Sequence, residues 1–147
     1  MITVGIPPAQ NVTIEMTSTF AIQMAPPDSH KAVYTGQLHY MNGTWYIKYA
    51  EEQEEGKTKA TLKIKDGEVS VIRNGAISMR HSYRPGVKTS GFYTGPAGRM
   101  QMDTETYKLE LGRDEDGFLS SAAWVYDLYL NEQKIGRYTI ACSLQRL

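Results

Sequence analysis

A run of acidic residues is the first part of the sequence with side chains suited to catalysis. Glu51, Glu52, Glu54 and Glu55 stand close together. Paired carboxylates act as acid and base, or as nucleophile and acid, when both face one substrate about 5–9.5 Å apart. Adjacent residues of a strand point to opposite faces, so this run is more typical of solvated charges at a strand end. Only Glu51, in phase with the apolar-face Tyr49, is a candidate for an inward carboxylate.

Histidine, cysteine and glycine-rich segments give weak signals for catalysis or metal binding. We predict His30 in a loop after two prolines, His39 on an outer face and His81 on an inward face. With one cysteine and no close His/Cys spacing, the sequence predicts neither a metal site nor a cofactor. That cysteine, Cys142, stands among apolar residues, where burial raises the pKa of a thiol and reduces its reactivity. The Gly91–Gly98 segment lacks the Lys-Ser/Thr of a phosphate-binding loop.

Alternation of apolar and polar residues with a period of two runs through nearly the whole chain and indicates an all-β protein. The even positions of Val12–Met24 are mostly apolar and the odd positions polar, and Gly117–Leu130 repeats the pattern with Trp124 and Tyr126 inward. At about 3.3 Å per residue, both segments exceed roughly 35 Å. We expect strands of this length in a small domain to coil or bend, as the strands of barrels do.

Two turn dipeptides predict hairpins with two-residue turns. Asn42-Gly43 and Asp66-Gly67 tolerate the positive φ angles that such turns require at both central residues. The first turn would place Tyr40 opposite Trp45, and both registers keep the apolar residues on one face.

A third dipeptide, Asn74-Gly75, predicts a different turn. A two-residue turn here would move Met79 and His81 to the solvent face, because a shift of one residue inverts a strand. We therefore predict a three-residue loop, Arg73 to Gly75, that pairs Val69 with Met79 and lifts Arg73 to the rim.

The remaining strands complete an antiparallel meander. Ser90–Thr94 and Arg99–Leu111 flank a turn, and a bulge near Thr104–Thr106 would explain why the apolar phase moves to Tyr107. Short connections of this kind predict eight to ten antiparallel strands in a closed barrel, with a sandwich as the alternative. We assign residues 11–147 to this single domain and residues 1–10 to a loose N-terminal arm.

Composition and charge exclude several classes of partner. The 147 residues fit one domain, and sixteen basic residues balance sixteen acidic ones. A net charge of zero argues against strong attraction to nucleic acid or to an anionic membrane. The chain has no basic, apolar secretory leader and no apolar stretch of about 18 residues, so we expect a cytoplasmic protein.

Several segments resemble one family of small bacterial proteins, the YwiB-like family. The resemblance covers roughly residues 12–144, and Gly95 departs from the threonine common at that turn. The matching positions are Tyr49, Glu51 and Glu52, Arg73 and Gly75, Tyr93 and Gly98, and Tyr126 and Leu128. The resemblance implies a barrel similar to the calycins, the superfamily of lipocalins and fatty-acid-binding proteins. It implies no activity.

The predicted interior is rich in methionine and in tyrosine or tryptophan. Methionine adapts its shape and tyrosine combines an apolar body with a polar tip, which suits either a small-molecule pocket or a filled core. The predicted inward residues of these types are Met16, Met24, Met79, Met100, Met102, Tyr34, Tyr40, Trp45, Tyr49, Tyr83, Trp124, Tyr126 and Tyr138.

Three hypotheses for function follow. The first is a non-enzymatic barrel that binds a small apolar or amphipathic molecule. Its candidate ligand-binding residues are Arg73, Tyr93, Glu51, Tyr49, Trp45, Met79, His81, Trp124 and Tyr126. The second is a filled barrel that acts through protein contacts or as a homodimer, using strand edges or the Lys57–Lys65 face. The third and weakest is an enzyme with a site around His81, Glu51 and Arg73, since catalysis usually needs several perturbed ionisable groups together.

Overall fold

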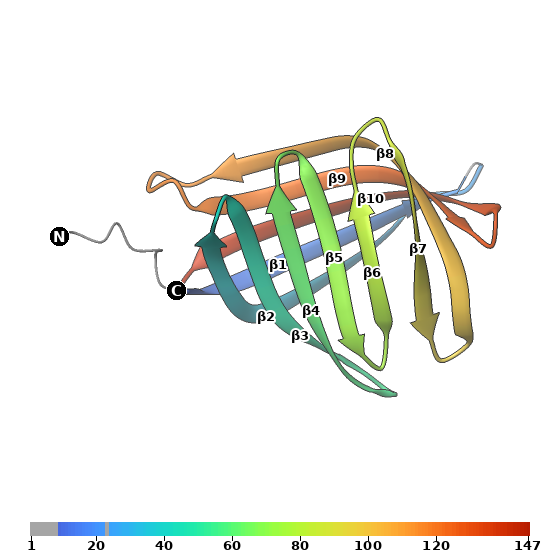
Figure 1. The fold of residues 1–147 in the computed structure, drawn as a ribbon, viewed down its shortest axis with the longest axis horizontal. Helices are drawn as coiled ribbons and strands as arrows, with labels where there is room; N and C mark the ends of the chain where they lie inside the picture. The colour runs from blue at the N-terminus through green and yellow to red at the C-terminus, as the bar shows by residue number, and fades with distance from the viewer. Residues whose placement is uncertain (1–8, 23) are drawn as a thin grey trace.

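Ten antiparallel strands follow one another along the chain and close into a barrel (Figure 1) in this computed structural model, which describes residues 9–22 and 24–147. Each strand pairs with the next, and β1 closes the ring by pairing with β10. The strands are β1 (Gln10–Ala21), β2 (Asp28–Met41), β3 (Thr44–Gln53), β4 (Gly56–Lys65), β5 (Glu68–Gly75), β6 (Ser78–Tyr83), β7 (Lys88–Gly95), β8 (Gly98–Arg113), β9 (Leu119–Leu130) and β10 (Gln133–Arg146). The predicted meander and its closure into a barrel are confirmed. None of the described residues belongs to a helix able to cross a membrane.

The first two hairpins have the predicted turns and registers. Asn42 and Asp66 both take positive φ angles, 53° and 47°, as two-residue turns of this kind require. Tyr40 lies opposite Trp45 across the first turn, and the ladder between β4 and β5 also runs in the expected register.

The predicted turn of the third hairpin is wrong. Arg73 pairs with Met79, so the connection is longer than the expected three-residue loop. The chain between them stays attached to β4, because Gly75 pairs with Thr58 and the backbone N–H of Ile77 donates to the Thr58 hydroxyl at 3.1 Å. Arg73 therefore remains in the ladder and is not lifted to the rim.

This register differs from the prediction by an even number of residues, so the inward face is unchanged. Val69 pairs with Tyr83 rather than with Met79, and Val71 pairs with His81. Met79, His81 and Tyr83 are buried, as the alternation predicted.

The bulge in β8 lies one residue beyond the predicted segment. The register between β8 and β9 shifts between Thr106 and Lys108, which leaves Tyr107 as the extra residue. Tyr107 was expected inward, but it points outward and its hydroxyl donates to Asp127 Oδ2 at 2.6 Å. Beyond the bulge, β8 pairs with β9 alone, so its other edge has no strand partner among the described residues. Leu111, near the end of this edge, is 45% exposed.

The hairpin between β1 and β2 also differs from expectation. β1 ends at Ala21, and Met24, predicted inward, is 99% exposed. His30, predicted in a loop, lies on β2 opposite Ser18 because the β1–β2 ladder continues to Phe20. Of the predicted N-terminal arm, residues 1–8 lie outside the described residues, and Gln10 begins β1.

Aliphatic side chains are concentrated in the half of the barrel nearest the C-terminus, where Val12 pairs with Arg146. The most deeply buried of them are Val12, Ile14, Leu38, Ile47, Ile64 and Val69. They come from β1 to β5 and pack into one hydrophobic core with Trp124 and Leu144. Cys142 belongs to this core, and burial raises the pKa of its thiol to about 12, as predicted.

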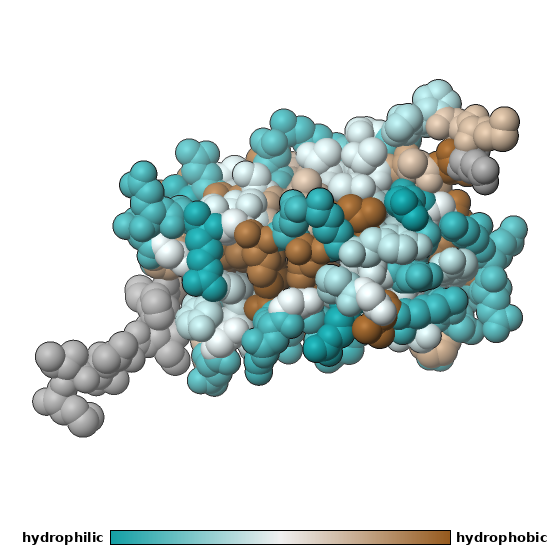
Figure 2. Space-filling view, turned by 90° about the horizontal axis from the view of Figure 1, so that it is seen from above, coloured by the Kyte–Doolittle hydropathy of each residue, from teal (hydrophilic) through white to brown (hydrophobic). Residues whose placement is uncertain are grey.

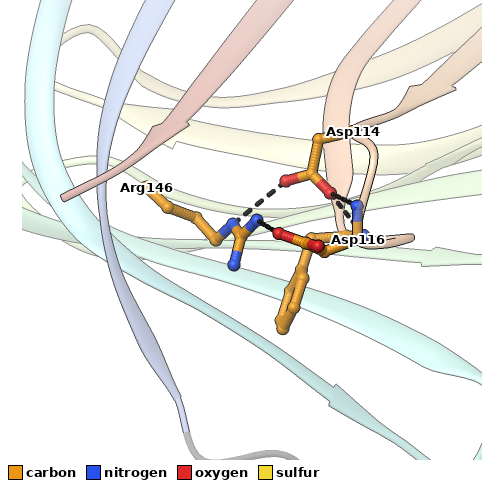
Figure 3. Close-up of polar contacts among 4 residues, drawn as sticks. Asp114, Asp116 and Arg146 are labelled. Atoms are coloured by element: carbon orange, nitrogen blue, oxygen red, sulfur yellow. Dashed lines mark hydrogen bonds and ion pairs between the residues drawn. The ribbon is translucent and has the colours of Figure 1, made fainter.

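An arginine on the last strand closes this end of the barrel. Arg146 donates from Nε to Asp114 at 3.0 Å and from Nη2 to Asp116 at 2.6 Å (Figure 3). The other oxygen of Asp114 accepts the backbone N–H groups of Asp116 and Phe118. The loop between β8 and β9 is thus folded onto β10, with the Arg146 guanidinium 4.3 Å from the centre of the Phe118 ring.

We predict that Asp127, on the outer face of β9, makes stability depend on pH. Its hydrogen bond with Arg137 lowers the pKa of this 2% exposed carboxyl to about 2, against about 3.9 in an unfolded chain. Its contribution is therefore complete above about pH 5 and is lost as the pH falls towards 2. Asp127→Asn should cost about 1–2 kcal/mol in urea unfolding at pH 7, since Arg137 and Lys134 are half exposed and screened. The difference from wild type should shrink below pH 4.

Glu115→Gln is the control for this experiment, because Glu115 is an exposed carboxylate on the loop between β8 and β9. It should leave the unfolding free energy unchanged at every pH. A constant difference between Asp127→Asn and wild type from pH 7 to pH 2.5 would contradict the prediction.

Candidate functional site: two cavities around an ion pair

The barrel holds two cavities in the half that the aliphatic core leaves open. The first, of about 250 Å³, is lined by residues of β1 to β6, β9 and β10, among them Met16, Ser18, His30, Tyr34, Tyr49 and Glu51. The second, of about 390 Å³, is lined by residues of β6 to β10, among them Met79, Tyr93, Met100, Met102, Leu128 and Tyr138. Arg73, Tyr83 and Tyr126 line both. The two cavities therefore meet at these three side chains.

An ion pair between β5 and β3 lies at this meeting point. Arg73 Nε donates to Glu51 Oε1 at 2.9 Å, and Arg73 Nη1 lies 3.3 Å from the sulfur of Met79. The two charged side chains are 25% and 14% exposed. Arg73 can reach across β4 because the residue paired with it there is Ala60, whose side chain is small.

Arg73, Tyr49 and Tyr83 keep their protons at neutral pH. The negative charge of Glu51 raises the pKa of Arg73 above its usual value, against the opposing effect of burial. Burial raises the pKa of Tyr83 to about 12 and holds that of Tyr49 above its usual range. The site thus combines one neutralised ion pair with protonated phenols, which donate and accept hydrogen bonds.

Aromatic rings form the wall around the ion pair. The ring of Tyr83 lies 4.6 Å from that of Tyr126 and 5.9 Å from that of Trp124, measured between centroids. Across the first cavity, the rings of Tyr34 and Tyr49 lie 4.6 Å apart.

A seam between β2 and β3 leads to the first cavity. The ladder between these strands runs from Met41 back to Gln37, and beyond it β2 pairs only with β1. Gly36 is the first residue of β2 beyond this ladder. It still lies close to β3, since a Cβ there would lie only 3.0 Å from the Cβ of Tyr49. The Tyr34–Tyr49 contact bridges the seam, so aromatic rings and not backbone hydrogen bonds separate the cavity from the outside here.

The structure places most of the predicted ligand-binding residues around these cavities. Glu51, Tyr49 and Trp124 line the first, Met79 and Tyr93 the second, and Arg73 and Tyr126 both. Trp45 and His81 line neither. Trp45 lies at the closed end, where its ring contacts those of Tyr40 and Phe118.

His81 belongs to a separate buried polar cluster. Its Nε2 is 2.6 Å from Thr104 Oγ1 and 3.3 Å from Thr89 Oγ1. The imidazole reaches from β6 to β8 over Gly91 of β7, where a Cβ would lie 2.9 Å from His81 Nδ1. Burial lowers the pKa of His81 to about 4, so the ring is neutral at pH 7. Its side-chain hydrogen bonds run to β7 and β8 and not to the Arg73–Glu51 pair.

Sequence reasoning missed two important cavity residues. Tyr83 was placed on the inward face but not at the site, although its phase and its position two residues after His81 were available signals. His30 gave no signal, because the alternating pattern of β2 does not extend to its first residues. Among the described residues, no cluster of three or more His, Cys, Asp or Glu could hold a metal ion.

Comparison with known proteins identifies the family. Residues 14–141 match the family described as "Domain of unknown function (DUF1934)". The chain is a member of the DUF1934 family. It is 30% identical over 100 residues to the "Uncharacterized beta-barrel protein YwiB" of Bacillus subtilis (strain 168), covering 68% of this chain and 69% of that protein. The predicted YwiB-like family membership is confirmed.

A solved structure from the same family has the same fold. The crystal structure of the ywiB protein from Bacillus subtilis superimposes with a TM-score of 0.75 at 22% identity, covering 94% of both chains. The ten-stranded closed barrel is thus the fold of this DUF1934 protein. Neither description names a ligand or an activity.

We predict that loss of the Glu51 charge destabilises the protein when Arg73 is present and destabilises it less when Arg73 is absent. Glu51→Gln leaves a mostly buried guanidinium without its counter-charge and should cost about 1–3 kcal/mol in urea unfolding. Adding Arg73→Met should recover part of that loss, because the unpaired charge is then removed. Glu15→Gln, in the exposed pair with Lys31 at 3.1 Å, is the control and should cost less than about 1 kcal/mol. Equal, small effects of the two single variants would contradict the assignment.

Proposed function

We propose that this DUF1934 protein binds one small amphipathic molecule inside the barrel, without transforming it. The observation that supports the proposal is the pair of interior cavities that meet beside the Arg73–Glu51 ion pair. Their volumes, about 250 and 390 Å³, suit a small ligand.

The lining suggests how the ligand lies. The second cavity is lined mainly by methionine, leucine and tyrosine, and it accepts the apolar part because methionine side chains adapt to irregular shapes. The polar part of the ligand lies at Arg73. Arg73 Nε donates a hydrogen bond to Glu51, while Arg73 Nη2 has no partner among the described residues. A free N–H of a guanidinium is a strong donor in a mostly buried site.

The polar part of the ligand is a neutral acceptor, such as an amide carbonyl. Glu51 already neutralises Arg73, so a carboxylate would gain little from the arginine and would be repelled by Glu51 at close range. The protonated phenols of Tyr49 and Tyr83 provide further neutral hydrogen bonds.

Titration with the neutral fluorophore N-phenyl-1-naphthylamine tests the cavity. We expect saturable fluorescence enhancement by the wild type. The double variant Arg73→Met/Glu51→Gln, which leaves no unpaired charge, should bind a competing decanamide at least tenfold more weakly. Decanamide should displace the fluorophore better than decanoate from the wild type.

The matched control removes a different ion pair. Lys31→Met/Glu15→Gln deletes an exposed pair between β1 and β2 and should leave both probes unaffected. Absence of saturable binding to the folded wild type would overturn the proposal, and better displacement by decanoate would overturn the neutral polar group.

A second candidate is a homodimer through the free edge of β8. The Lys57–Lys65 strand offers no edge, because β4 is paired on both sides. β8 beyond Tyr107 does, and an antiparallel pairing centred on Leu109 sets Lys108 against Glu110 of a second copy. Figure 2 shows an apolar patch among hydrophilic side chains on the face of the molecule seen from above.

Light scattering after size exclusion tests this second candidate. A dimer should dissociate on Leu111→Lys, which adds a charge to the exposed apolar side chain of this edge. Leu147→Lys, at the exposed last residue, is the control and should leave the mass unchanged. A monomeric wild type at 100 µM would rule the dimer out.

A further inference from the structure

The outer face of β3 to β8 carries unpaired positive charge. Its cations are Lys48, Lys59, Lys63, Arg80 and Arg99, which project from β3, β4, β6 and β8. None of them forms an ion pair with another described residue. The strands are neighbours in the ladder, so these charges share one continuous surface.

Several acidic residues are held in ion pairs away from this face. Asp114, Asp116 and Asp127 are bound by arginines of β10, and Glu15 is paired with Lys31. On the basic face itself, Glu52 pairs with Lys57, Glu68 lies opposite Lys65, and Asp103 and Glu105 lie further along β8. None of these carboxylates forms an ion pair with the five cations, so the charge of the cations is not neutralised by direct contact although the chain has no net charge.

Two aromatic rings lie on the same face, next to its cations. Phe92 is 51% exposed, and the Arg99 guanidinium lies 3.9 Å from the centre of its ring. The Lys63 ammonium lies 5.7 Å from the centre of the Tyr46 ring. The argument against nucleic acid from the sequence relied on a net charge of zero, which does not show where the cations and these two rings lie on the surface.

A groove on this face brings the charge and the exposed ring together. It measures about 480 Å³, and its lining includes Asn74, Ser78, Arg80, Phe92 and Arg99. Arg80 lies directly opposite Phe92 in the ladder, so the ring has a cation on each side. The amide and hydroxyl groups add hydrogen-bonding capacity to the groove.

We propose that this face binds single-stranded nucleic acid. Basic surfaces that follow the phosphates and exposed rings that stack with bases are the two features such binding requires, and both are present. Guanidinium groups suit phosphate because they can form two hydrogen bonds with it at once. The ring of Phe92 holds the guanidinium group of Arg99 in place. One exposed ring in a polar groove is too little apolar surface for insertion into a membrane.

Fluorescence anisotropy with labelled dT12 and U12 tests the proposal. We expect both oligonucleotides to bind at 50 mM salt, with a salt dependence that corresponds to about three to five phosphate contacts, that is a log–log slope of about −2 to −3.5. Arg80→Ala/Arg99→Ala should weaken binding at least tenfold and reduce the slope by about 1.4. Phe92→Leu should weaken binding by about fivefold or more through loss of stacking.

The control removes the same amount of charge from another side. Lys31→Ala/Lys134→Ala deletes two exposed cations on β2 and β10 and should change the affinity less than twofold. All variants should keep the wild-type circular dichroism, since the substituted residues project to solvent. Arg73 and Met79 line both the groove and the interior cavities, but none of the substituted residues lines either of the two interior cavities, so these results can be told apart from the fluorophore titration.

Three outcomes would overturn the proposal. The first is no binding by the folded wild type at 50 mM salt. The second is an equal loss of affinity in the two double variants, which would show attraction by overall charge alone. The third is binding of inorganic polyphosphate as tight as that of dT12 with no effect of Phe92→Leu, which would show a site for polyanions in general.

Discussion

Closure of the ladder is the constraint on which the rest of this structure depends. Once β1 pairs with β10, every second side chain of ten strands must enter a limited interior. Aliphatic residues fill one half, but the other half receives an arginine, a glutamate and several tyrosines. These polar groups cannot reach water easily, so Arg73 and Glu51 pair with each other. The cavities lie around that pair because large side chains anchored to a polar centre do not interdigitate as aliphatic ones do.

Local patterns were sufficient to predict most of the fold. Alternation alone identifies the strands and their inward faces, and positive-φ dipeptides set the registers at Asn42 and Asp66. The third hairpin could not be predicted, because its length depends on a bond from Ile77 to Thr58, nineteen residues away in the chain. No local pattern contains that information. The inward phase survived because the register shift is even.

The sequence predicted which residues point inward, but not which of them surround the cavities. Alternation cannot tell which inward residues fill the core and which surround empty space, and so it grouped Trp45 with Trp124. Alternation also cannot show that an inward side chain forms its hydrogen bonds away from the cavities. His81 extends over Gly91 to Thr104, a contact made possible by a missing Cβ on the neighbouring strand. The outer face was harder still, because its charge is visible only once the strands are placed side by side.

The pairing of the first strand with the last also determines when this protein can finish folding. β1 has a complete set of hydrogen-bond partners only after residues 137–146 have joined it. During synthesis those residues follow all the other strands, so β1 keeps one open edge until β10 has been made and has paired with it. Open edges recruit strands of other chains. Non-local closure of this kind is also slow, which prolongs the time during which aggregation through that edge can occur.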